Sequence, residues 1–206
     1  MARIVEVIGR KVWDSRGRAT VEAEVLVKGA RGRAIAPAGA STGAGEAKSI
    51  DTRQAVHYVN TEIRNVLVGK SLNQEENDHT LIALDGTPDK SRLGGNALVA
   101  VSLACAHAAA AAKKMPLWRF LAGDRNVAMP VPQVQIFGGG AHARGRVDLQ
   151  DYMIICVGAG SFAESLEWTA EVYRAAGARL AKRGALQGVA DEGGYWPAFK
   201  SNEEGL

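Results

Sequence analysis

The sequence predicts an α+β N-terminal domain, an antiparallel β-meander with helices, followed by the start of an α/β domain. Two changes of pattern support this. Apolar residues alternate with polar ones in the first forty residues, as in strands, and from Asp51 they recur every three or four residues, as in helices. After the stretch Asn126 to Pro132, which contains two prolines, the pattern changes to strand followed by helix. We therefore place the domains at residues 1–125 and 126–206.

The first forty residues contain three predicted strands. Apolar residues alternate with glutamates from Val21 to Val27. Ile4 to Val7, ahead of the turn-like DSRG at Asp14 to Gly17, predict a strand before it, and Gly32 to Ala36 predict a short strand after it. Three successive strands with short connections predict an antiparallel meander.

Four helices are predicted to follow the meander. Asp51 and Asn73 are placed to cap the first two, because short polar side chains satisfy free backbone N–H groups at helix starts. Asn96 is expected to open an alanine-rich helix, and Pro116 to lie in the first turn of the short helix LWRFLAG.

The second domain begins with two predicted strands, Val131 to Phe137 and Asp151 to Val157, and Ser161 with Glu164 predicts a capping box for a long helix. The final SNEEGL is typical of the opening of another helix. Two strands and such helices would leave a sheet edge and apolar faces uncovered, so we expect the chain to be a truncated part of a larger protein.

Composition narrows the class of protein. Hydrophobic residues make up 47% and charged residues 23%, which excludes a disordered or collagen-like chain. The net charge of +3 comes with no long Lys/Arg run, so neither nucleic acid nor membrane is an expected partner. The alanine-rich stretch Ala97 to Ala112 is expected to be a buried helix of a soluble protein. Cys105 and Cys156 are expected to be buried and unpaired, which suits the cytoplasm.

The first candidate site segment is the loop PAGASTGAGE, Pro37 to Glu46. Its glycines could close over an anion or a metal, and Ser41 and Thr42 offer hydroxyl oxygens. Because the loop lacks the lysine of a P-loop, nucleotide binding is not expected. Taken alone, such a loop is an ordinary surface turn at least as often as a site.

Three further segments carry polar side chains next to glycines or strand ends. His142 follows three glycines after a predicted strand, and Asp148 and Asp151 flank Gln150 at the start of the next strand. In ADEGGYWP, Asp191 and Glu192 are adjacent acids, so mutual repulsion and burial could prepare one of them as a general acid. Each segment has a structural alternative: a hydrogen-bonded turn for the histidine, a strand-end cap for the aspartates, and a solvated turn for the acidic pair.

Seven motifs in order give the chain a resemblance to enolases, the magnesium-dependent hydratases of 2-phosphoglycerate. They are DSRG, GASTG, LDGTPDKSRLGGNA, VSLACAHAAA, PLWRFLAG, DEGG and KSNEE, and they cover almost the whole chain. The resemblance implies an α+β N-terminal domain followed by the start of an enolase-type, TIM-like barrel with an antiparallel opening. It also implies a dimer or a larger ring of dimers.

The resemblance further implies roles for individual residues. Ser41 would ligate a second magnesium ion, His142 would lie on a loop that covers the substrate, and Glu192 would help the C3 hydroxyl group to leave. Asp151 stands where enolases have a second active-site glutamate, in the motif QEF, and is one methylene shorter. The lysine base and the main magnesium ligands would lie in barrel segments beyond Leu206.

Three functions fit these observations. The first is an enolase acting on 2-phospho-D-glycerate. The second is an enolase-like paralogue acting on a related phosphonate or phosphate, like the carboxyphosphonoenolpyruvate synthases, because Gly138 and Ala141 replace an Asn and a Ser of the enolase loop NGGSHA and Asp151 replaces the glutamate. The third is a non-catalytic fragment that serves as a binding or assembly module.

Overall fold

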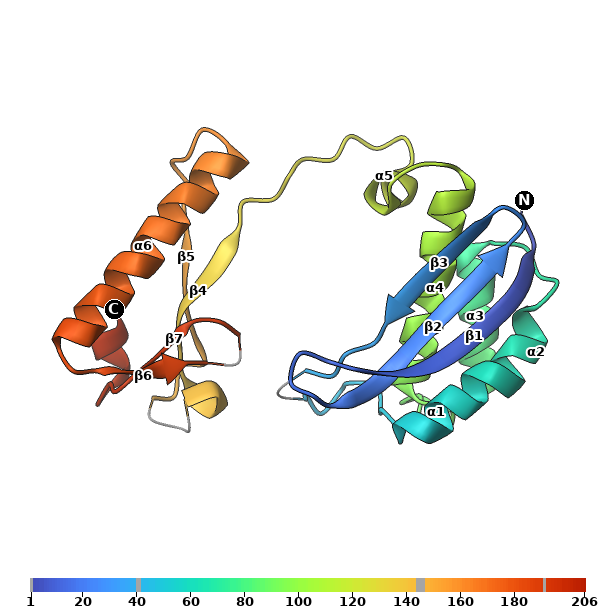
Figure 1. Ribbon diagram of the computed structural model, residues 1–206, viewed down its shortest axis with the longest axis horizontal. Helices are drawn as coiled ribbons and strands as arrows, with labels where there is room; N and C mark the ends of the chain where they lie inside the picture. The colour runs from blue at the N-terminus through green and yellow to red at the C-terminus, as the bar shows by residue number, and fades with distance from the viewer. Residues whose placement is uncertain (1, 40–41, 144–146, 191) are drawn as a thin grey trace. The chain divides into compact units, whose positions relative to one another are not determined.

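The computed structural model describes residues 2–39, 42–143, 147–190 and 192–206, and the side chains of residues 142 and 143 lie outside this description. The chain divides into two compact units, Met1–Asn126 and Val127–Leu206 (Figure 1). Each unit has a sheet and a core of its own.

The sheet of the first unit is the predicted antiparallel meander. Strands β1 (Ile4–Trp13), β2 (Ala19–Val27) and β3 (Ala30–Ile35) lie in the order β1-β2-β3. The turn between β1 and β2 is the DSRG segment, in which the Asp14 carboxylate accepts hydrogen bonds from the backbone N–H groups of Arg16 and Arg18. An aspartate that binds the backbone two residues on stabilises such a turn, so the motif has a structural role here.

Six helical segments follow the meander. They are α1 (Thr52–Tyr58), the π-helical turn η1 (Val59–Ile63), α2 (Arg64–Leu67), α3 (Gln74–Asp85), α4 (Gly95–Ala112) and α5 (Leu117–Ala122). Asp51 caps α1 and Asn73 caps α3 through their side chains, as predicted. Asn96 lies in the first turn of α4, the helix that it was expected to open. Its side chain exchanges hydrogen bonds with the backbone N–H and C=O of Ile50, and the cap position is Gly94.

Helix α4 forms the centre of the first unit and packs on β2 and β3. A side chain at Gly32 would put its Cβ atom 2.1 Å from the backbone nitrogen of Ala108, so only glycine lets the strand approach this closely. Among the described helices, α4 is the one long and apolar enough to cross a membrane by length and composition. Its alanines are instead largely buried in the core of this unit.

The sheet of the second unit has four strands in the order β5-β4-β7-β6. Strands β4 (Gln133–Gly138) and β5 (Asp151–Ile155) are antiparallel, β4 and β7 (Tyr195–Pro197) are parallel, and β7 and β6 (Leu186–Val189) are antiparallel. The sequence predicted β4 and β5 and missed β6 and β7, which are short and contain a glycine or a proline. Within the described residues this mixed sheet does not close into a barrel.

Helix α6 (Phe162–Lys182) packs on this sheet. Ser161 caps it as predicted, by accepting a hydrogen bond from the backbone N–H of Glu164. The Glu164 carboxylate accepts from the backbone N–H of Gly160 rather than from that of Ser161, so the capping box is shifted by one residue. The final segment forms a single 3-10 turn, η3 (Asn202–Gly205), in place of the predicted helix start.

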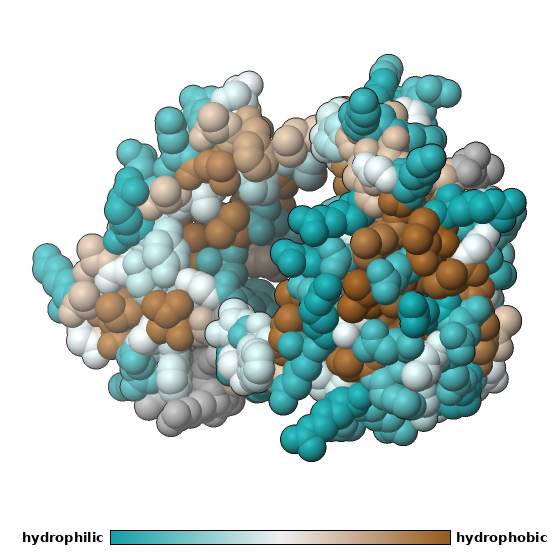
Figure 2. Space-filling model, turned by 45° about the vertical axis from the view of Figure 1, so that its right-hand side comes forward, coloured by the Kyte–Doolittle hydropathy of each residue, from teal (hydrophilic) through white to brown (hydrophobic). Residues whose placement is uncertain are grey.

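Exposed apolar side chains occur on both units (Figure 2). On α6 they are Phe162, Leu166, Trp168 and Val172, which are at least 40% exposed. The prediction that both cysteines are buried holds for Cys105 and is wrong for Cys156, which follows the end of β5 and is half-buried.

Candidate active site

An irregularity in the pairing of β4 with β5 places two polar side chains on one face of the sheet. Gln135 pairs with Met153, whereas Phe137 pairs with Tyr152, because β4 contains one extra residue between these pairs. Phe137 and Tyr152 thus both join the core of the second unit. Asp151 lies two residues from Met153 on β5, so its side chain shares a face with that of Gln135. Bulges often redirect a side chain next to an active site in this way.

The Gln135 amide joins two carboxylates that lie far apart in the sequence. Its nitrogen Nε2 donates one hydrogen bond to Oδ1 of Asp151 and another, of 3.1 Å, to Oε2 of Glu192. Its oxygen accepts from the backbone N–H of Gly194 at 3.0 Å. The second oxygen of Asp151 accepts from Nε2 of Gln150 at 3.2 Å. The two predicted acidic site residues are therefore brought together by a glutamine that no sequence motif predicted.

Glu192 lies in the turn between β6 and β7. The turn is closed by backbone hydrogen bonds from Ala190 to Gly194 and from Gly193 to Ala190. Gly193 has a φ of +94°, in the left-handed region that favours glycine. A Cβ atom on Gly194 would lie 2.4 Å from the amide oxygen of Gln135, so the second glycine of DEGG leaves the space that this side chain fills.

Tyr173 of α6 ties the helix to the same turn. Its hydroxyl group donates to the carbonyl oxygen of Gly193 at 2.9 Å, and its ring stacks on Tyr195 with 4.2 Å between ring centroids. Burial, followed by the neighbouring Tyr195, raises the pKa of Tyr173 above its ordinary value.

The loop between β4 and β5 is held by its glycines and by the last turn of the chain. A Cβ atom on Gly139 would lie 1.9 Å from the carbonyl oxygen of Leu149, and the Gly139 N–H donates to the carbonyl oxygen of Gln150 at 2.7 Å. The side chain of Asn202 accepts from the backbone N–H groups of Asp148 and Leu149. Asn202 of the KSNEE motif thus positions the start of β5, where Asp151 lies.

The other predicted site residues have different places. His142 lies in the 3-10 turn η2 (Gly140–Ala143), and its side chain is outside the described residues, as are Ser41 and Asp191. Asp148 contacts Asn202 and not the pair formed by Asp151 and Glu192. The segment VPQVQIF, read from Val131, contains two glutamines at alternate positions, Gln133 and Gln135, and no local signal distinguishes the one that contacts the acids.

Magnesium binds six oxygen ligands in nearly octahedral geometry. Within the described residues no three His, Cys, Asp or Glu side chains converge. Asp151 and Glu192 are two carboxylates already bonded to an amide nitrogen. The described side chains therefore do not by themselves make up a magnesium site.

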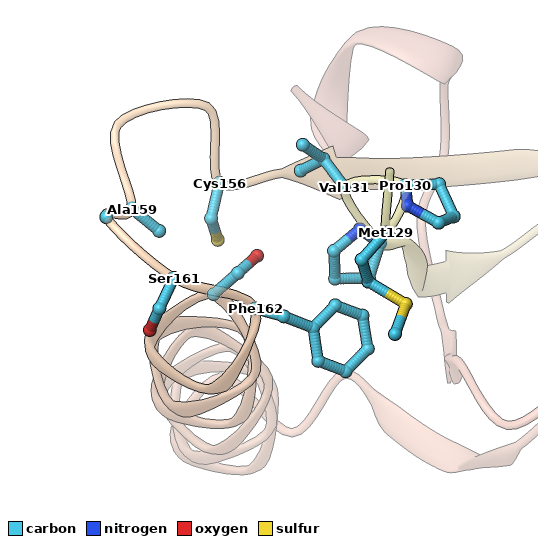
Figure 3. Close-up of a pocket in the computed structure, with 10 residues that line it drawn as sticks. Met129, Pro130, Val131, Cys156, Ala159, Ser161 and Phe162 are labelled. Carbon is cyan, nitrogen blue, oxygen red and sulfur yellow. The ribbon is translucent and has the colours of Figure 1, made fainter. Parts of the chain in front are cut away.

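A pocket of the second unit lies elsewhere. This hollow of about 210 Å³ is found between the segment from Met129 to Pro132, Cys156 and the start of α6 (Figure 3). Cys156 follows the carboxyl end of β5, whereas Asp151 begins that strand. The hollow is thus separate from the paired carboxylates.

Two family models match the chain. The N-terminal domain of enolases matches residues 4–121, and the C-terminal TIM-barrel domain of enolases matches residues 126–206. The three-stranded sheet with its helices and the partial mixed sheet correspond in order to these two domains. The resemblance deduced from the seven motifs is confirmed, and the chain belongs to the enolase family.

Proposed function

We propose that this chain is part of an enolase that removes water from 2-phospho-D-glycerate to give phosphoenolpyruvate, with Mg²⁺ as cofactor, in glycolysis and gluconeogenesis. Membership of the enolase family supports a water-eliminating lyase. The observation that most supports the specific proposal is the convergence of Asp151 and Glu192 on the Gln135 amide. Two acids from separate segments, held by one neutral donor, suit the proton transfer to a leaving hydroxyl group.

In this proposal Glu192 protonates the hydroxyl group as it leaves, and Asp151 orients the substrate beside it. The glycine turn lets the carboxylate of Glu192 lie at the surface, where its side chain is exposed and accessible to a small molecule. His142 and Ser41 would bind the substrate from two loops, and Ser41 would ligate a magnesium ion that accompanies it. The family's lysine base would first abstract the proton next to the substrate carboxylate.

The test is the dehydration rate of 2-phosphoglycerate in protein expressed from the full reading frame that contains this chain. Product is followed by the ultraviolet absorbance of its enol double bond, with and without Mg²⁺. We expect Mg²⁺-dependent turnover, and we expect Glu192→Gln to lower kcat by about 100-fold to 10,000-fold, the usual contribution of a general acid. Glu167→Gln, an exposed glutamate on α6, is the matched control and should retain the full rate. A full rate in the Glu192→Gln variant would refute the assigned role.

A paralogue that acts on a related phosphonate or phosphate is the second candidate, and Asp151 favours it. Its side chain is one methylene shorter than the glutamate implied by the resemblance, and a displacement of about 1 Å can cost 100-fold in rate. Folded full-length protein that fails to dehydrate 2-phosphoglycerate but converts a phosphonate analogue would establish this candidate. Failure with both classes would leave the binding or assembly module.

We further propose a homodimer, or a larger ring of dimers, in the cytoplasm. Light scattering of the full-length protein measures the oligomeric state directly, and a monomer at all concentrations would contradict the proposed dimer.

A further inference from the structure

We propose that Gln135 is a positioning residue that fixes the arrangement of the Asp151 and Glu192 carboxylates, and that its length is matched to the short side chain of Asp151. Its kinetic test rests on the proposed function, whereas its structural test does not.

In the hydrogen bonds of Gln135, the amide oxygen accepts and the amide NH₂ group donates, and the partners leave no other choice. A glutamine amide has two N–H donors and one carbonyl acceptor. The backbone N–H of Gly194 can only donate, so it fixes the carbonyl oxygen of Gln135 toward the turn. The NH₂ group then faces Asp151 and Glu192, and a carboxyl oxygen of each accepts from it. The orientation of the amide follows from its partners.

An uncharged donor between two carboxyl groups positions them through hydrogen bonds, whereas a cation would also offset their charge. Like charges a few ångströms apart repel, and hydrogen bonds to ionised groups are stronger than those between neutral groups. The amide offsets this repulsion when both groups are ionised, and it still bonds to both when Glu192 carries the proton that it would donate. Because Gln135 stands on a strand and its carbonyl is bonded to Gly194, the NH₂ group has a fixed position from which it orients both acids.

The lengths of the side chains at positions 135 and 151 are coupled through this contact. Gln135 has two side-chain methylenes and Asp151 has one, and their polar ends meet on one face of the β4–β5 pair. A longer acid at position 151 must displace the amide and strain the hydrogen bond that its oxygen accepts from the Gly194 N–H. Shortening Gln135 to asparagine while lengthening Asp151 to glutamate would keep the same total of three methylenes.

The kinetic test compares the wild type with Gln135→Asn, Asp151→Glu and the double variant. We expect each single change to lower kcat by about 10-fold to 100-fold, as misplacement of a reacting group does, and to leave KM within about 3-fold. The double variant should recover most of the loss, because the two changes compensate. If the losses of the single variants multiply in the double variant, the proposed match of lengths is wrong.

A variant with a charged side chain separates the two functions of the Gln135 amide, which are to accept a hydrogen bond from Gly194 and to donate to the two acids. Gln135→Glu keeps an oxygen for the Gly194 N–H and replaces the donor by a further carboxylate oxygen. We expect it to lower kcat by at least about 100-fold, whereas Gln133→Glu, the same change at an exposed position on the same strand, should stay within about 2-fold. Equal rates in the two variants would overturn the positioning role.

A direct structural measurement makes the outcome independent of activity. Side-chain NH₂ groups of glutamines are resolved by NMR, and those held in hydrogen bonds exchange more slowly with water. In the wild-type protein the NH₂ group of Gln135 should exchange at least about 10-fold more slowly than that of Gln133, and Asp151→Ala should remove most of the difference. If turnover of 2-phosphoglycerate is absent but this protection is present, the proposed function fails and the arrangement stands. Equal exchange at both glutamines would refute the arrangement itself.

Discussion

The hydroxyl group of Tyr173 donates a hydrogen bond of 2.9 Å to the carbonyl oxygen of Gly193, and this bond joins α6 to the turn that carries Glu192. A helix outside the sheet thereby restrains a residue of the candidate active site. Tyr173 also stacks on Tyr195, which starts β7 directly after the turn.

Tyr173→Phe keeps the stacked ring and removes the hydroxyl group. We expect it to lower the free energy of unfolding by about 1 kcal/mol, the usual net value of one hydrogen bond, and kcat by up to about 10-fold because the turn is less restrained. Thermal unfolding and steady-state kinetics measure the two effects. Tyr58→Phe, which loses a hydrogen bond from Gln54 in the first unit, is the control and should leave kcat unchanged. A Tyr173→Phe protein with unaltered stability and rate would show that this contact does not restrain the turn.

Gly194→Ala is expected to inactivate without unfolding. Its Cβ would lie 2.4 Å from the Gln135 amide oxygen, the end of a flexible side chain that can swing away. We expect a loss of stability of about 1–3 kcal/mol, typical of overpacking, and a fall in kcat of at least about 10-fold. Gly158→Ala is the control, because a Cβ there meets only ordinary contacts with Trp168 at 3.7 Å. An active Gly194→Ala enzyme would mean that the amide need not occupy its observed place.

Asp85 should make the stability of the first unit depend on pH. Its side chain is 2% exposed, and the carboxylate accepts hydrogen bonds from the Leu93 N–H at 2.7 Å and from the N–H and hydroxyl groups of Thr87. Burial by itself raises the pKa of Asp85, but the bonds from Thr87 and Leu93 together lower it below the ordinary value of 3.8.

A carboxyl group whose pKa is lower in the folded state adds stability above its unfolded pKa and loses it as the pH falls through its folded pKa. We therefore expect the contribution of Asp85 to the free energy of unfolding to be complete above about pH 5 and to decline below about pH 4. Asp85→Asn should flatten this decline and cost about 1–3 kcal/mol at neutral pH. Urea titrations across pH measure both effects, with the exposed Asp124→Asn as a control that keeps the decline. An unchanged acid limb in Asp85→Asn would contradict the assignment.

The two thiols should differ in reactivity. Cys105 is fully buried in α4, and burial, with a smaller effect from Asp78, raises its pKa to about 12. Because the thiolate is the reactive form, we expect an alkylating reagent to modify Cys105 only after unfolding and the half-buried Cys156 in the native protein. Mass spectrometry of peptides after brief labelling distinguishes the two sites. Labelling of both cysteines at the same native rate would show that α4 opens readily.

Much of the fold follows from local sequence patterns. Alternation over Val21 to Val27 predicted β2 and its meander, and the polar residues Asp51, Asn73 and Ser161 were correctly placed as helix caps, because strand alternation and capping depend on residues only a few positions apart. The partner of the Asn96 side chain was not predicted, because it is Ile50, 46 residues away, and a local pattern contains nothing of such a partner.

In the candidate site, too, local patterns predicted some features and missed those that depend on distant partners. The acids Asp151 and Glu192 were predicted from their motifs, but Gln135 was not, since it alternates with Gln133 on the same strand and no local signal distinguishes the two. Strands β6 and β7 were missed because they are short, with glycine or proline inside them, and pairing with distant segments stabilises them.

The sequence by itself determined the meander, the main helices and the family, and it predicted the two acids of the candidate site, because each is encoded in short-range spacing or in an ordered set of motifs. Only the tertiary structure decided that these acids meet at Gln135. That meeting depends on an extra residue in β4 opposite β5 and on contacts that span 16 and 57 positions of the chain. A bulge and a bridging amide are properties of paired strands, and pairing is fixed by packing between segments that are remote in sequence.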